Sequence, residues 1–455
     1  MLRLPAIGSF TGDFRSLPPE SIGRSDMEVQ ILSSELIKPS TPTPDEKKTY
    51  MVTFFEQLAP KMHIPLVYFY SFEGQGTIVD ADKHEQFKKS LSETLSIFYP
   101  LAGRFAKDGL SVNCNDQGAL YYEAKASVKL VEFLSQVSKN LDLLNDYFPR
   151  DIGEYNSGTT PLVAVQVTTF ECGGVALAVC SSHAIADGFT GCTFISDWAA
   201  MSKLGTIKPL NYERSAFPTK DIDGIKPPPG GKTGAKYVTK KFLFNGSAVS
   251  SLKAKVVPGI LHHPSKVEVA TACIWRGLIR ASRAVHGHLR PSVMSLTMNL
   301  RGRTPMRIPS DSFGNCYIEF PIKFMGEEDK MDLHDLVVLV RDAIRNTLTE
   351  CEKALNADEL FSLVFEKLKE VREIMHDDEV DFYWLSSLCR FPLYGADFGW
   401  GKPCFVTGDS VPAEMVALKD TECGTGIEVK VSVTEADMLG LEADPDVIAF
   451  ASSVK

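Results

Sequence analysis

The chain lacks any long hydrophobic run, since no window approaches the roughly 18 consecutive apolar residues of a membrane-spanning helix. Its ten cysteines include no C-x-x-C pair and no cluster with histidine at zinc spacing. With no secretory signal apparent, we expect reduced thiols in the cytosol. The net charge of -10 disfavours non-specific binding to nucleic acid, although an anionic ligand needs only a local basic patch. We therefore expect a cytoplasmic protein with no membrane and no nucleic-acid partner.

Several common catalytic signatures are also absent. The sequence contains no G-x-S-x-G turn, no G-x-x-x-x-G-K-[ST] phosphate loop, no G-x-G-x-x-G fingerprint and no H-E-x-x-H pair. It therefore gives no sign of a permanently bound cofactor or metal. What is present is the composition of an ordinary globular protein, with 44% hydrophobic and 23% charged residues.

The length of 455 residues predicts two domains rather than one core. Residues 1–26 mix proline, glycine and serine without periodicity, and we expect a flexible N-terminal extension there. A second break, over 208–236, contains a Pro-Pro-Pro-Gly-Gly run and is typical of a crossover linker. We predict an N-terminal domain over 27–207 and a C-terminal domain over 237–455.

Strand and helix patterns interleave in both predicted domains, which favours the α/β class. Strands are expected at 29–37, 65–70, 110–124 (two short strands), 161–170, 175–179, 240–244, 292–300, 383–388, 404–406, 413–419 and 426–433. Helices are expected at 81–98, after residue 188, and at 267–285, 333–348 and 360–374.

One histidine lies where chemistry is often found. The apolar runs 161–170 and 175–179 surround a Gly-Gly turn and predict a β-hairpin. His183 and Asp187 therefore fall in the turn between a buried strand and a helix, a place that commonly carries function. An imidazole with an ordinary pKa near about 6.5 suits general-base catalysis. The H-x-x-x-D spacing alone also fits a packing histidine, with Asp187 capping the next helix.

A second stretch, Asp397 to Pro403, reads D-F-G-W-G-K-P in a Gly-rich turn before a strand. Together, H-A-I-A-D-G at 183–188 and D-F-G-W-G resemble the two signatures of the plant BAHD acyl-CoA-dependent acyltransferases. Similar stretches are Y-P-L-A-G-R at 99–104, N-L-R at 299–301 and F-G-N at 313–315. The resemblance extends from about residue 29 to the C-terminus.

Within that family, two further stretches narrow the resemblance. Residues 37–44 and 170–174 most resemble the group of vinorine synthase and salutaridinol acetyltransferase, which acetylate hydroxyls of polycyclic alkaloids. Ser312 stands where the Y-F-G-N-C stretch of anthocyanin acyltransferases has tyrosine, which speaks against an anthocyanin acceptor.

The resemblance implies two chloramphenicol-acetyltransferase-like domains of mixed sheet plus helices, with a channel at their interface. It implies acyl-CoA, above all acetyl-CoA, as co-substrate and a plant alcohol, an alkaloid or terpenoid, as acceptor. His183 would remove the hydroxyl proton during attack on the thioester, without an acyl-enzyme. The indole N–H of Trp400 is a candidate donor to the oxyanion.

Other family positions imply supporting roles. Asp187 would pair with Arg301 instead of relaying a proton to His183. Asp397 would hold its turn together with Gly399 and Gly401. Candidate contacts to CoA are Ser265 and Lys266, which precede the helix expected from residue 267, and Lys402. One base and one channel need no second subunit, so we expect a monomer.

Rival readings stay open from the sequence. Within the same class, the acyl group could be aromatic or branched, or the acceptor an amine or anthocyanin. A catalytically inactive relative would bind a metabolite without acyl transfer. A metal-dependent hydrolase built on His183 and Asp187 would lack a third ligand at local spacing.

Overall fold

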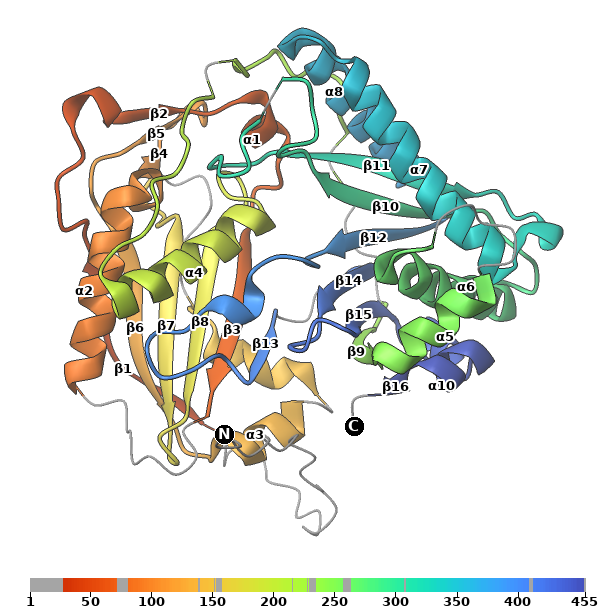
Figure 1. Cartoon of the computed structure of the whole chain (residues 1–455), viewed down its shortest axis with the longest axis horizontal. Coiled ribbons are helices and arrows are strands. Elements are labelled where there is room, and N and C mark those ends of the chain that lie inside the picture. Colours follow the sequence, from red (N-terminus) through yellow and green to blue (C-terminus); the bar gives the residue numbers. More distant parts are fainter. Residues whose placement is uncertain are drawn as a thin grey trace, which may run out of the picture.

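The computed structural model describes residues 28–453, apart from 72–80, 138–139, 151, 153–157, 215, 227, 229–234, 257–262, 307 and 409–411. The expected extension over 1–26 lies outside the described residues. Two large sheets stand side by side with helices packed around them (Figure 1). The fold is α/β with two sheet-rich halves, as the sequence predicted.

The first sheet is mixed, because β6 and β7 run parallel while its other neighbours are antiparallel. Its strands, in spatial order, are β1 (Val29–Ile37), β6 (Ala119–Ala126), β7 (Val163–Phe170), β8 (Val175–Ser182), β3 (His63–Tyr70) and β13 (Phe405–Thr407). The helices of this half are α1 (Phe54–Leu58), α2 (Ala81–Ile97), α3 (Leu130–Val137) and α4 (Gly188–Leu204), with short turns η2 (Asp45–Lys47), η3 (Tyr99–Ala102) and η4 (Leu141–Tyr147).

The second sheet is mixed as well, since β12 lies parallel to both β10 and β14. Its strands, in spatial order, are β11 (Tyr317–Phe324), β10 (Ser292–Asn299), β12 (Asp381–Ser387), β14 (Met415–Asp420), β15 (Ile427–Thr434), β9 (Tyr237–Phe244) and β16 (Ser452–Ser453). Around it lie α5 (Gly246–Val256), α6 (Lys266–His286), α7 (Leu333–Lys353), α8 (Ala357–Ile374), α9 (Glu435–Glu442) and α10 (Pro445–Phe450), with η5 (Glu328–Lys330) and η6 (Leu393–Gly395). A small third sheet joins β2 (Thr49–Met51), β5 (Ser111–Asn113) and β4 (Arg104–Phe105).

The central strand β8 is buried along its whole length and apolar up to Cys180, because it is covered on both faces. Val175, Leu177 and Val179 pack in the core beneath α2 and α4. The alternate residues Ala176 and Ala178 pack on the opposite face, in the core that includes α3. β8 therefore emerges from a rigid core at Ser182 and carries the next residue, His183, on a fixed base.

The strand β13 crosses from one half of the chain to the other. It comes from the range 237–455, yet it pairs with β3 at the edge of the first sheet, Phe405 opposite Phe69. Figure 1 shows this blue strand beside the orange and yellow strands of the first sheet. The three residues of β13 pair with β3 at the edge of the first sheet. The D-F-G-W-G segment just before them therefore lies beside the N-terminal half.

Among the described residues, no helix is long and apolar enough to cross a membrane.

Candidate active site

His183 sits directly after β8, in a turn held from both halves of the molecule. Its backbone N–H donates to the carbonyl of Met62 at 2.8 Å, and its own carbonyl accepts from Nδ2 of Asn315 at 2.9 Å. Its ring centroid lies 5.8 Å from that of Tyr317, the first residue of β11 in the second sheet. The imidazole therefore stands where the two sheets meet, as the predicted interface channel requires.

Burial sets the protonation state of this histidine. Desolvation lowers the pKa of His183 below its ordinary value, and the negative charge of Asp187 acts the other way without compensating. The ring is therefore neutral at pH 7. A neutral imidazole has a lone pair with which to accept a proton, the first requirement for a general base.

Both carboxylate oxygens of Asp187 accept hydrogen bonds from groups other than His183. Oδ1 accepts from the backbone N–H of Thr190 at 2.9 Å, which makes Asp187 the N-cap of α4. Oδ2 accepts from Nη1 of Arg301 at 2.7 Å and from the backbone N–H of Cys316 at 3.0 Å. Burial alone would raise the pKa of Asp187, but the Arg301 charge and these hydrogen bonds hold it below its ordinary value. The described contacts of Asp187 include no bond to His183, so the carboxylate is an anchor and not a relay.

Arg301 connects Asp187 to the second half of the molecule. Its guanidinium also donates to the carbonyls of Ser312 at 2.9 Å and Gly314 at 2.7 Å, and it lies over the ring of Phe189 at 4.6 Å. The pairing of Asp187 with Arg301 that the family resemblance implied is therefore present. It ties the start of α4 to the segment that precedes β11.

A second buried ion pair, which the sequence reading missed, supports the same segment. Glu56 and Arg214 meet at 2.5 Å with side chains 1% and 5% exposed. Oε1 of Glu56 also accepts from the N–H of Asn315 at 2.7 Å, while Arg214 donates to the Asn315 carbonyl at 2.6 Å. The one local signal was the capping box that Glu56 forms with Thr53 at the start of α1. The partner Arg214 lies far along the chain, in the expected linker.

Gly314 is required by this arrangement. Its φ of 101° lies in the left-handed region, and an added Cβ would stand 1.9 Å from Nη1 of Arg214. The F-G-N stretch thus lets the guanidinium reach the backbone of Asn315.

Three buried polar atoms beside the turn have no hydrogen-bond partner among the described residues. They are Oγ of Ser182, Nδ1 of His183 and Oδ1 of Asn315. Buried polar groups in folded proteins are normally paired, and unpaired ones call for an explanation. Here the three belong to adjacent or directly bonded residues, so they indicate a place where a polar ligand is received.

The D-F-G-W-G loop is held by Asp397. Its Oδ1 accepts from the N–H groups of Gly399 and Gly401, both at 2.9 Å, and these glycines adopt φ values of 107° and 109°. Oδ2 accepts from Lys203 of α4 at 2.5 Å. Burial would raise the pKa of Asp397, but Lys203 and the two N–H donors lower it below its ordinary value. The carboxylate therefore organises the turn, as expected.

Trp400 lies in an aromatic cluster, and its role as an oxyanion donor stays a prediction. Its ring stacks on Phe398 and meets the edges of Phe87 and Tyr70 at 5.1 and 6.3 Å. Tyr70 pairs with Val175, at the opposite end of β8 from His183. The indole is a packing group that fastens the loop to the first half.

The predicted CoA contacts do not converge on His183. Ser265 caps α6 through a capping box with Glu268. Lys266 pairs with Asp420 at 2.8 Å and donates to the carbonyl of Gly424 at 2.5 Å, so its charge already holds the turn between β14 and β15. Lys402 is exposed and makes no hydrogen bond or ion pair within the described part of the chain. These three residues stay predictions.

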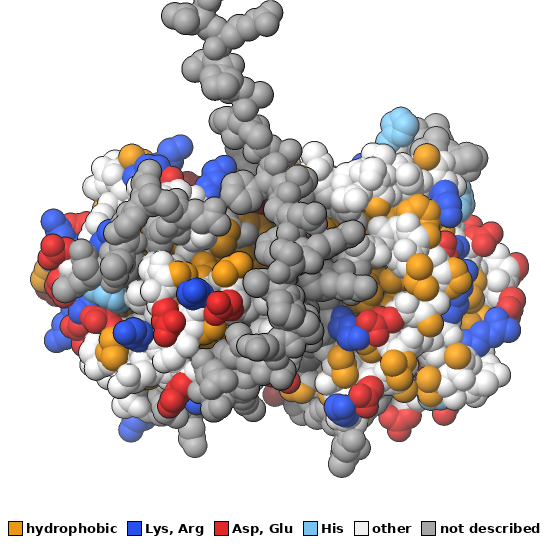
Figure 2. Space-filling model, turned by 90° about the horizontal axis from the view of Figure 1, so that it is seen from below, with side chains coloured by type: hydrophobic (Ala, Val, Ile, Leu, Met, Phe, Trp, Pro, Cys, Tyr) orange, Lys and Arg blue, Asp and Glu red, His pale blue; other side chains and the backbone are white. Residues whose placement is uncertain are grey.

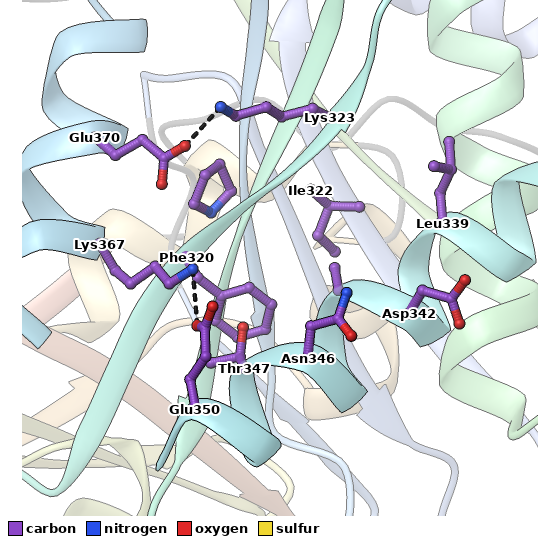
Figure 3. Close-up of a pocket in the computed structure, with 12 residues that line it drawn as sticks. Phe320, Ile322, Lys323, Leu339, Asp342, Asn346, Thr347, Glu350, Lys367 and Glu370 are labelled. Carbon is purple, nitrogen blue, oxygen red and sulfur yellow. Dashed lines mark hydrogen bonds and ion pairs between the residues drawn. The ribbon is translucent and has the colours of Figure 1, made fainter. Parts of the chain in front are cut away.

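A groove on the second half has a different character. Seen from below, basic and acidic side chains mix on both halves (Figure 2). The groove in Figure 3 lies between α7, α8 and β11, and four of its charged side chains pair with one another, Lys323 with Glu370 and Lys367 with Glu350. Across the described residues, no group of three or more His, Cys, Asp or Glu could hold a metal ion.

Comparison with known proteins decides the family. A family model described as "Transferase family" matches residues 27–447. The chain belongs to this family, the BAHD acyltransferases. It is an acyl-CoA-dependent O-acyltransferase, as the two motifs predicted.

Relatives within the BAHD family cover nearly the whole chain. A limonoid 7-O-acetyltransferase of Citrus sinensis is 32% identical over 94% of this chain and 98% of its own. Akuammiline synthase 1 of Alstonia scholaris is 34% identical, over 93% and 98% respectively. The crystal structure of vinorine synthase superposes with a TM-score of 0.79 at 30% identity, covering 94% of this chain and all of that one. A TRI101 structure from F. graminearum, complexed with ethyl coenzyme A, shares the fold at a TM-score of 0.71 and 16% identity.

We predict that Asp187→Ala destabilises the protein as well as slowing it. The change leaves Arg301 buried without its carboxylate and removes the cap of α4, and breaking one side of a buried pair costs about 3–5 kcal/mol. Denaturant unfolding of the purified variant measures the loss. The exposed Asp311→Ala is the matched control, and a fully folded Asp187→Ala with unchanged melting would contradict the anchoring role.

We predict that Trp400→Phe keeps kcat near that of the wild type, because the smaller ring retains the packing on Phe87 and Tyr70. Loss of an oxyanion donor would instead lower kcat by about 10²–10³-fold. Steady-state kinetics separate these results. Trp400→Ala should lower the melting temperature, since it vacates the aromatic cluster altogether.

Proposed function

We propose that the enzyme transfers an acetyl group from acetyl-CoA to a hydroxyl of a polycyclic plant metabolite, an alkaloid or terpenoid alcohol, with His183 as general base. The observation that carries the proposal is the neutral imidazole of His183, which is partly exposed with its Nδ1 buried, at the meeting of the two sheets. The carboxylate of Asp187 in the same turn is bonded to Arg301.

The proposed reaction is a single transfer within a ternary complex. The imidazole of His183 takes the proton of the acceptor hydroxyl as its oxygen attacks the thioester carbonyl carbon. The tetrahedral intermediate then expels the sulfur of CoA, which takes the proton back from the imidazolium. The products are the ester and free CoA, and His183 returns to its neutral form.

The cysteines beside the motif support direct transfer over an acyl-enzyme. Burial raises the pKa of Cys192 to about 12 and raises that of Cys316 as well. A thiol of this kind is not ionised at neutral pH, and the thiolate is the nucleophilic form. Neither residue therefore offers an activated nucleophile.

The names of the relatives guide the choice of acceptor. Several are limonoid acetyltransferases from Citrus sinensis and Melia azedarach, and stemmadenine O-acetyltransferase comes from Catharanthus roseus. An acetyl-CoA-benzylalcohol acetyltransferase of Clarkia breweri, 31% identical, extends the range to a simple aromatic alcohol. The acceptor panel should therefore contain alkaloid, terpenoid and benzylic alcohols.

We further propose that the enzyme acts as a cytoplasmic monomer. The ten cysteines, all in the described part of the chain, form no disulfide, which suits a reducing compartment. One chain supplies the base and both sheets that flank it, so a second copy adds no required group.

We predict that His183→Ala abolishes acceptor-dependent CoA release while the protein stays folded. Removing a general base lowers the rate by about 10²–10⁴-fold. A thiol-release assay with acetyl-CoA and the acceptor panel measures it. The matched control is His63→Gln, because His63 pairs with Ser182 across the sheet and donates or accepts at the carbonyl of Pro161. Loss in His63→Gln with activity retained in His183→Ala would assign the base to His63.

We predict an acid limb in the pH profile of kcat/KM with its midpoint below about 6.5, the ordinary histidine pKa. Burial lowers the pKa of His183, so the neutral form and full activity are present above that midpoint and are lost as the pH falls through it. Far-UV circular dichroism over the same range shows whether the fold survives. A midpoint above 7 in a folded enzyme would contradict a buried neutral base.

A further inference from the structure

One lysine, Lys241, is buried between the two halves and makes no direct ion pair with any described residue. Lys241 lies on β9, where Phe242 and Phe244 pack in the core of the second half, so Lys241 faces the other way, toward the first sheet. It is only 5% exposed. Within the described residues it makes no hydrogen bond and no ion pair, and its Nζ lies over the ring of Phe405 at 4.1 Å. Buried charges are normally paired, so this one calls for a partner.

Two more lysines share its face of the second sheet. Lys430 on β15 stands directly opposite Lys241, and like charges in directly opposed positions destabilise a sheet. Lys419 on β14 also lies over the Phe405 ring, at 5.6 Å. Its charge is met by Glu428 at 3.2 Å, and Lys419 also donates to the hydroxyl of Tyr394 at 3.1 Å. The cluster thus gathers three lysines on one face of the second sheet, with Glu428 beside them.

The end of β13 lies beside Lys430. A Cβ added to Gly408, just after β13, would stand 3.5 Å from Nζ of Lys430. Burial lowers the pKa of Lys241 to about 7, and its lysine neighbours add to the effect, while Glu428 opposes it. An anion brought to Nζ would reverse that shift and restore the full charge of the ammonium group.

We propose that Lys241, flanked by Lys430 and Lys419, forms an anion-binding site between the two sheets that takes a phosphate group, that of the acyl-CoA donor in preference to free phosphate. The assignment to CoA rests on the proposed function. No contact to these three lysines was expected from the sequence, in contrast to Ser265, Lys266 and Lys402.

The position of the cluster fits a donor stretched along the interface. Phe405 pairs with Phe69, and Phe69 pairs with Ala176 of β8. His183 lies seven residues farther along that chain, roughly 20–25 Å away at the rise of a strand. CoA carries its phosphates at the far end of the pantetheine arm from its sulfur. A thioester at His183 would therefore place the phosphates toward this end of the same interface.

The test uses calorimetric titration, which needs no acceptor. CoA, 3′-dephospho-CoA, pantetheine and inorganic phosphate are each titrated into the wild type, Lys241→Gln and Lys241→Arg. Lys125→Gln, an exposed lysine of β6, is the matched control for the loss of one positive charge. Thermal melting of each variant reports whether it is folded.

We expect Lys241→Gln to weaken CoA binding about ten-fold or more, the loss expected of one charge-assisted hydrogen bond. Lys241→Arg should restore most of the affinity, and pantetheine, which has no CoA phosphates, should bind all the variants equally. If the affinity for 3′-dephospho-CoA does not depend on Lys241, the site binds the 3′-phosphate of CoA. If that affinity still depends on Lys241, the site binds the diphosphate.

Equal CoA affinity in the wild type and Lys241→Gln would overturn the inference, as would an equal loss for pantetheine. Inorganic phosphate that binds in a Lys241-dependent manner, with no CoA binding, would assign the site to free phosphate. A wild type that binds CoA normally but transfers no acetyl group would instead count against the proposed function and leave this site standing.

Discussion

Charge buried between the two halves must be paired, and this requirement sets the geometry of the site. Asp187 and Arg301 form one pair, and Glu56 and Arg214 form another, each nearly inaccessible to solvent. Every carboxylate oxygen of these pairs also accepts from a backbone N–H, and each guanidinium also donates to at least one backbone carbonyl. Because removing one partner of such a pair is costly, each pair admits few alternative arrangements. The segment that leads into β11 is therefore fixed against the start of α4.

His183 benefits from this rigidity without touching either carboxylate. In a Ser-His-Asp triad an aspartate holds the imidazole in its tautomer. Here two hydrogen bonds hold the backbone of His183 instead. Its N–H donates to the carbonyl of Met62, and its carbonyl accepts from the side chain of Asn315. Asn315 is itself held by the second ion pair. Orientation thus comes from packing and backbone bonds, while burial keeps the ring neutral, and both conditions favour a base that is ready before the substrate arrives.

Local patterns in the sequence predicted the long helices and most strands of the two large sheets, because the causes of these elements are local. The helices α1, α3, α5, α9 and α10 were not predicted. The apolar run of β8 reflects burial on two faces, and the cap of α4 follows from the chemistry of Asp187. The strand β11 escaped prediction because Pro321 lies within it, and proline is tolerated there only because β11 forms an edge of its sheet. No local sequence pattern predicts the pairing of β13 with β3 or the contact of Trp400 with Phe87. Both join residues far apart in the chain, and neither spacing nor composition encodes which half receives a loop.

Lys241 stands out against the charges that are paired. Arg301, Arg214, Lys266 and Lys419 each meet a carboxylate at the interface or near it, so the fold can supply partners where stability needs them. Departures from local consistency are expected at functional positions. Binding energy gained at a remote part of a substrate can hold its reacting end in place. A phosphate site at one end of the inter-sheet space and a neutral base at the other would use the length of CoA in this way. The lysine cluster would then contribute to catalysis at His183 through the position of the thioester, although it lies too far away to touch the reacting atoms.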